Sequence, residues 1–118
     1  MKVSSCYSIF AFASMEGAKK VYVDTLGCKV VHQIEFPGHQ YCTVEDASGN
    51  RTDLIVGDDA KPGFFGLRVN VDDFEEALEE YKQAGAKVLF GPFDLPKSKL
   101  VSLDIPYGEN ISLFYHKK

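Results

Sequence analysis

The sequence predicts one α+β domain built from two copies of a β-α-β-β-β module. The first observation behind this prediction is an internal repeat. Leu26–Val31 aligns with Ala84–Leu89 at an offset of 58 residues, and Ser48–Leu54 aligns with Tyr107–Leu113 at an offset of 59. Two matches at nearly the same offset indicate a duplicated unit, and the same order of elements in both halves is the second observation.

The second half shows this order clearly. Residues 63–71 are apolar and strand-like. Asp72 and Glu75 resemble a capping box at the start of a helix. From Phe74 onward, apolar residues recur at the i, i+3, i+4, i+7 spacing of one helix face, and Gly85 is predicted to end the helix. Three further strands are predicted at residues 87–90, 100–105 and 111–115, the first ended by Gly91 and Pro92.

The first half repeats the order more faintly. Ser14 is placed to cap a helix that ends at Gly27, although Gly17 weakens its first turn. Strands are predicted at residues 7–13, 29–36, 40–45 and 51–56.

The two modules are expected at about residues 1–57 and 63–118, joined by a linker at 57–63. Half-units of this size cannot each close a hydrophobic core, because small chains bury too little of their surface. We therefore expect them to pack as a single domain over residues 1–118.

Composition excludes several classes of protein. Hydrophobic residues make up 45% and charged residues 25%, as in ordinary soluble domains. The net charge of −4 argues against a nucleic-acid partner, and no apolar run has membrane-spanning length. The N-terminus lacks a signal-peptide pattern, and three cysteines without CxxC spacing are typical of reduced thiols. We expect a cytoplasmic protein.

Three segments resemble a known superfamily. Val21–Val30 (VYVDTLGCKV) is similar to its F-Y-x-D-x-L-G-F-x-V pattern, and Asp104–Leu113 to its D-P-x-G-N-x-I-E-L pattern, with Gly85–Pro92 as further support. This is the vicinal oxygen chelate superfamily, which includes glyoxalase I, extradiol dioxygenases, methylmalonyl-CoA epimerase and bleomycin-resistance proteins. The resemblance implies a glyoxalase-like fold, in which the modules form a curved, trough-like mixed sheet, and a homodimer.

The resemblance also implies four inward positions that hold a divalent metal in this superfamily. In this sequence they are aligned with Tyr7, Asp53, Phe64 and Ser112. Phe64 cannot ligate a metal, and only Asp53 is a competent ligand as it stands. We therefore expect no metal site and no cofactor. The histidines are interpreted as surface or strand residues: His32, His39 and His116.

Strand alternation predicts which side chains line the trough. Arg51 and Arg68, the only two arginines, fall on the inward parity, either as an anion clamp or as side chains that reach solvent. Tyr41 and Tyr107 are candidates for the rim. The predicted ligand-binding residues are Tyr7, Arg51, Asp53, Phe64, Arg68, Ser112 and Phe114. The residues predicted to pack under the helices are Phe10, Phe12, Leu54, Phe65, Leu67, Ile111 and Leu113.

The leading functional hypothesis is metal-independent binding of a small molecule in the trough, resembling bleomycin-resistance-type sequestration. The first alternative is a divergent metal-dependent lyase, isomerase or dioxygenase with an atypical site on Asp53 and Tyr7. The second is a degenerate structural or partner-binding module. The sequence leaves open whether the protein is an enzyme and which ligand it binds.

Overall fold

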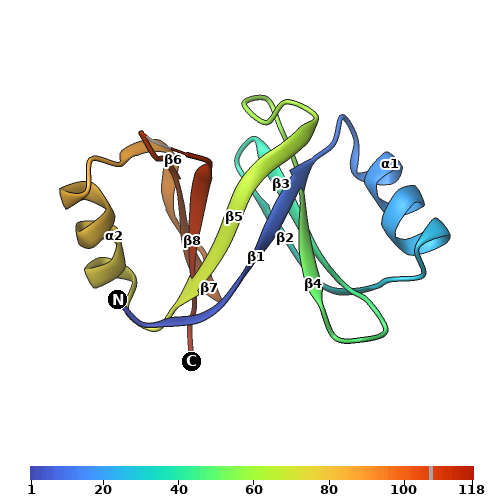
Figure 1. Cartoon of the computed structure of the whole chain (residues 1–118), viewed down its shortest axis with the longest axis horizontal. Coiled ribbons are helices and arrows are strands. Elements are labelled where there is room, and N and C mark those ends of the chain that lie inside the picture. The colour runs from blue at the N-terminus through green and yellow to red at the C-terminus, as the bar shows by residue number, and fades with distance from the viewer. Residues whose placement is uncertain (107) are drawn as a thin grey trace. The chain divides into compact units, whose positions relative to one another are not determined.

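The computed structural model describes residues 1–106 and 108–118, and these form two compact units. The first unit is Tyr7–Phe65, and the second unit is Gly66–Lys118 together with Met1–Cys6. Both units contain the β-α-β-β-β order, so the predicted α+β class is confirmed (Figure 1).

The sheet of the first unit has the strand order β2-β3-β4-β1. The hairpin neighbours β2–β3 and β3–β4 are antiparallel, and β1 pairs with β4 in parallel. Ala18 of the helix α1 packs on Cys42, Val44 and Leu54, so this helix covers one face of the sheet. The elements are β1 (Val3–Ala11, in this unit from Tyr7 onward), α1 (Met15–Lys19), β2 (Lys29–Phe36), β3 (His39–Glu45) and β4 (Arg51–Gly57).

The cap predicted for α1 is confirmed, because the Ser14 hydroxyl accepts a hydrogen bond from the Gly17 N–H at 3.0 Å. The helix then changes its winding and continues as a π-helical segment, η1 (Lys20–Thr25). Gly27 has a φ of +74°, the left-handed conformation that ends helices. Sequence periodicity predicted one helix here and did not separate the α and π turns.

The second unit has the strand order β5-β8-β7-β6, with β5 and β8 parallel. The helix α2 lies beside β8 (Figure 1). The predicted stripe on α2 is confirmed, since Phe74, Ala77 and Leu78 are buried in one cluster with the sheet. The elements are β5 (Gly63–Val71, in this unit from Gly66 onward), α2 (Phe74–Gln83), β6 (Lys87–Asp94), β7 (Ser98–Asp104) and β8 (Asn110–His116).

Two local predictions for this unit were wrong. The cap of α2 is Asp73, whose carboxylate accepts from the Glu76 N–H at 3.0 Å, one residue later than the predicted Asp72. β6 does not end at Gly91 and Pro92 but continues to Asp94 with irregular pairing to β7. An edge strand tolerates proline because one side of it makes no ladder bonds.

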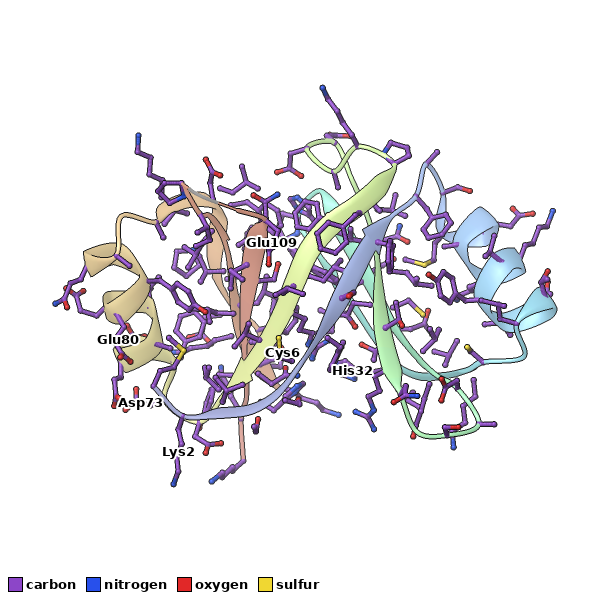
Figure 2. The ribbon with its side chains drawn as sticks, viewed as in Figure 1. Lys2, Cys6, His32, Asp73, Glu80 and Glu109 are labelled. Carbon is purple, nitrogen blue, oxygen red and sulfur yellow. The ribbon has the colours of Figure 1, made fainter. Side chains whose placement is uncertain are left out.

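The outer face of α2 is acidic and exposed, as its charge pattern indicates. Figure 2 shows Asp73 at the start of this helix and Glu80 further along it. The N-terminal amine of Met1 lies 2.9 Å from Glu80 Oε2, and Glu80 raises the pKa of that amine above its ordinary 8.0. This face is therefore a solvated surface tied to the N-terminal segment.

The two units repeat each other with one constant offset. In the first unit Ile9 is the register partner of Asp53, and in the second Arg68 is the register partner of Ser112. Each member of the second pair follows its counterpart by 59 residues, since 68 − 9 and 112 − 53 both equal 59. Asp53 and Ser112 are thus equivalent positions.

The same offset relates the helix caps Ser14 and Asp73. Applied to Tyr7, it gives Gly66 as the equivalent residue rather than Phe64. The sequence alignment, which placed this position at Phe64, therefore lies two residues too early in the strand. Of the four positions that the superfamily resemblance implies, the third therefore corresponds to Gly66, which has no side chain.

Gly66 lies where its strand closely approaches Asn110 on β8. A Cβ atom at Gly66 would lie 2.1 Å from the Asn110 carbonyl oxygen. We predict that Gly66→Ala lowers the free energy of unfolding by about 3 kcal/mol, because backbone must move to accept the methyl group. Gly108→Ala is the control, since nothing lies within 4 Å of its Cβ position. Equal urea midpoints for the two variants would contradict this packing.

The turn between β3 and β4 is organised by one carboxylate. Asp46 Oδ1 accepts from the backbone N–H groups of Asn50 and Ser48, each at 2.9 Å. These bonds, with the Asn50 N–H the largest contributor, lower the pKa of Asp46 below its ordinary 3.8. The turn fixes the register in which Thr43 lies opposite Asp53.

A lowered folded pKa stabilises the protein above the unfolded pKa, and this contribution is lost as pH falls through the folded value. We predict that Asp46→Asn lowers Tm at pH 6 and that its difference from wild type shrinks when pH falls below 3.8. Thermal unfolding from pH 2.5 to 7 measures this. Asp24→Asn, which removes an exposed carboxylate outside this turn, is the matched control.

Candidate functional site

The two fourth-strand positions of the repeat hold side chains that bond to their neighbours across the sheet. Asp53 Oδ1 accepts a hydrogen bond from Thr43 Oγ1 at 2.5 Å. The hydroxyls of Ser102 and Ser112 are 2.6 Å apart in the equivalent place. All four side chains are at most 1% exposed. Both positions are therefore buried, and each has a hydrogen-bond partner on the neighbouring strand.

A second buried polar group surrounds Arg68 in the second unit. Its guanidinium lies over the Phe114 ring, 3.9 Å from the centroid. Nε donates to Asn70 Oδ1 at 3.0 Å, and a terminal nitrogen donates to His116 Nε2 at 2.9 Å. With 1% exposure, Arg68 does not reach solvent. The arginine predicted to face inward is therefore a buried side chain with hydrogen-bond partners in the protein.

The remaining sequence-predicted residues lie in more open surroundings. Tyr7 is half-buried. Arg51 is exposed and lies 3.8 Å from Glu45 in an ion pair. Phe64 is 53% exposed, and its ring packs edge-on against Phe10 at 5.7 Å. Of the seven predicted residues, the structure brings together Arg68, Ser112 and Phe114, which share one parallel strand pair.

Most residues predicted for the opposite faces do pack under the helices. Phe12 and Leu54 contact the cluster around α1. Leu67, Ile111 and Leu113 belong to the cluster around α2. Phe10 packs against Phe64 instead, and Phe65 is buried outside both clusters.

The side chains at the four superfamily positions do not fit a divalent metal. They offer one carboxylate (Asp53), one phenol (Tyr7), one hydroxyl (Ser112) and, at Gly66, no donor. Zinc and related ions require imidazole, thiolate or carboxylate donors, generally three or more from the protein. Across residues 1–106 and 108–118, no three His, Cys, Asp or Glu residues gather in a group able to hold such an ion.

A pocket of about 730 Å³ opens at one end of the sheet of the first unit. It lies between the turn joining β2 to β3 and the segment at residues 57–62. Its volume is within the range of small-molecule sites. The lining residues are Phe12, Ala13, Glu35, Phe36, Gly38, His39, Gln40, Val56, Gly57, Asp58, Ala60, Lys61 and Pro62.

His39 braces one wall of this pocket. Its Nε2 lies 2.7 Å from Asp59 Oδ1, and its Nδ1 lies 3.0 Å from the Pro37 carbonyl oxygen. A carbonyl and a carboxylate oxygen only accept, so the imidazole donates from whichever ring nitrogen carries its hydrogen. The ring also stacks on Phe36, at 5.0 Å between centroids. His39 therefore links the β2–β3 turn to the segment after β4.

Gly57 makes this arrangement possible. It is the register partner of His39, and a Cβ atom at Gly57 would lie 2.6 Å from His39 Cδ2. Only a residue without a side chain lets the imidazole lie flat across the end of β4.

Sequence reasoning missed this pocket, and none of the seven predicted residues lines it. Pro37–Gly38 and residues 57–63 were each identified as a turn or linker, and His39 as a surface histidine. The missing information was the pairing of His39 with Gly57, which brings the two segments together. Tyr41, a predicted rim residue, is buried and stacks on Phe36, while Tyr107 lies outside the described residues.

We predict that His39→Ala lowers the free energy of unfolding by about 1–2 kcal/mol, because it removes a stacked ring and a hydrogen bond to a carboxylate. Chemical denaturation measures the loss. Gln40→Ala, at the neighbouring exposed position, should change the midpoint little. A similar midpoint for both variants would show that His39 does not brace the wall.

Comparison with known proteins identifies the family. The Glyoxalase/Bleomycin resistance protein/Dioxygenase superfamily model matches residues 10–111, so the chain belongs to this superfamily and the predicted resemblance is confirmed. No curated protein matches the chain. None of the described helices has the length and apolar content that crossing a bilayer requires.

Solved structures share the fold at low sequence identity. Methylmalonyl-CoA epimerase from Mycobacterium tuberculosis is 18% identical, with a TM-score of 0.74 over 98% of this chain and 90% of that one. A hypothetical protein from Bacillus halodurans C-125 is 16% identical, with a TM-score of 0.70 over 98% and 97%. A Streptomyces coelicolor methylmalonyl-CoA epimerase variant in complex with 2-nitronate-propionyl-CoA is 15% identical, with a TM-score of 0.70 over 100% and 99%. These similarities confirm the glyoxalase-like fold.

Proposed function

We propose that this protein binds a small organic molecule without a metal ion, using the pocket at the end of the first unit's sheet. The observation that supports it is the state of the two fourth-strand positions. Asp53 and Ser112 are fully buried, and each shares a hydrogen bond with the hydroxyl opposite it. The oxygens of both side chains already have protein partners, whereas superfamily relatives would bind a metal with the side chains at these positions.

The exposed fractions favour the pocket as the binding site over the side chains that strand alternation predicted to line the trough. Asp53, Arg68, Ser112 and Phe114 are each at most 1% exposed, so a ligand would have to displace their contacts. The pocket is open, and Gly57, which lines it, lies on the same face of β4 as Asp53 by strand alternation. The proposed site is therefore a continuation of the predicted inward face at its open end.

The chemistry of the wall favours binding over turnover. A general base must present a free lone pair to its substrate. Both nitrogens of His39 already lie within hydrogen-bond distance of protein oxygens, those of Pro37 and Asp59. His39 and Asp59 are suited to holding the wall of the pocket in place, as in a sequestration protein, which binds its ligand without converting it. The cytoplasmic location and the homodimer expected from the sequence belong to the same proposal, and light scattering of the purified chain tests the dimer.

We predict that the protein takes up no stoichiometric Co²⁺ at pH 7.5, because three of its four superfamily positions lack a competent donor. Calorimetry and the visible spectrum of Co²⁺ measure this for the wild type, Asp53→Asn and the control Asp46→Asn. One equivalent of tightly bound Co²⁺ that is lost only in Asp53→Asn would overturn the metal-free proposal.

A second candidate function is catalysis by a divergent enzyme of this superfamily. It is favoured by the methylmalonyl-CoA epimerases among the similar structures and by the buried carboxylate of Asp53. An epimerase exchanges the proton next to its thioester carbonyl with solvent. The metal-free binding proposal predicts no deuterium uptake into methylmalonyl-CoA above the buffer rate in D₂O, followed by mass spectrometry. Uptake that Asp53→Asn abolishes and Asp46→Asn retains would establish the enzyme instead.

A further inference from the structure

The pocket of the first unit has an unequal distribution of charge. Glu35 and Asp58 both line it with exposed carboxylates, and Lys61 is its one lysine. Asp59, close by, is already engaged by His39 at 2.7 Å. Among residues 1–106 and 108–118, neither Glu35 nor Asp58 makes an ion pair within 4 Å, so their charges remain available to a ligand.

The rest of the lining is apolar and partly aromatic. Phe36 is fixed between stacking contacts to His39 and Tyr41, at 5.0 and 5.6 Å. Phe12, half-buried, is held edge-on by Tyr22 at 6.0 Å. Rings fixed by their neighbours give a rigid wall, which favours a flat partner because little side-chain entropy is lost on binding. The remaining apolar lining is Ala13, Val56, Ala60 and Pro62.

We propose that this pocket takes an organic cation with a flat apolar body, of the class of protonated aromatic amines. The apolar wall would bury the ring system, and Glu35 and Asp58 would meet the positive group at the open side. An anion of the same shape would face the two carboxylates of Glu35 and Asp58 and the single ammonium group of Lys61, so it would be bound less favourably. This inference rests on the proposed function, because it assumes that the pocket binds small molecules.

The test compares two fluorescent dyes of opposite charge at pH 7.5. Proflavine is a flat cation, and 8-anilinonaphthalene-1-sulfonate is an anion of similar size. Proflavine should bind the wild type more tightly. Glu35→Gln and Asp58→Asn should each weaken its binding about threefold, and the double variant about tenfold, as expected for exposed charge pairs. Affinity should also fall when salt rises from about 20 to 500 mM.

The controls separate this proposal from the proposed function. Glu79→Gln, an exposed charge on α2, should leave proflavine binding unchanged. The substituted carboxylates are exposed, so circular dichroism should show an intact fold for every variant. Tighter binding of the anionic dye, or an unchanged affinity in the double variant, would overturn the cation class while small-molecule binding stands. Binding of neither dye would overturn both.

Discussion

The burial of Asp53 is the constraint on which the rest of this structure depends. A fully buried carboxylate is unfavourable unless hydrogen bonds replace its lost water, and Thr43 supplies one of them. Thr43 lies opposite Asp53 only in the observed register of β3 and β4, which the Asp46 turn fixes. In the second unit, Ser102 and Ser112 occupy the equivalent positions and also share a hydrogen bond. The repeat therefore retains a hydrogen-bonded pair across the sheet, although the side chains differ.

Along β4, the buried middle of the strand differs from its open end. The middle of β4 is committed to internal contacts, whereas its end at Gly57 has no side chain and borders an open pocket. His39 can lie across that end only because Gly57 leaves room, and its contact with Asp59 holds the following segment in place. The accessible site is therefore formed where strand pairing stops and a turn and a linker meet.

The sequence was sufficient for the fold but did not locate the pocket. Apolar periodicity and the repeat predicted both modules, and Lys29–Phe36 and Gly63–Val71 were predicted with their exact bounds. The third superfamily position was aligned two residues too early, at Phe64 rather than Gly66, because the strand pairing that sets the constant offset is not encoded in a local pattern. The pocket depends on the pairing of His39 with Gly57, a contact between two strands that no local pattern encodes.

The most direct measurement of the central claim is a map of amide chemical shifts in the wild-type protein during titration with a panel of flat aromatic amines and acids. If binding occurs without metal at the end of the sheet, the largest changes fall on Gly38, His39 and Gly57. Changes centred on Asp53 and Ser112, or changes that require an added divalent metal, would contradict the account.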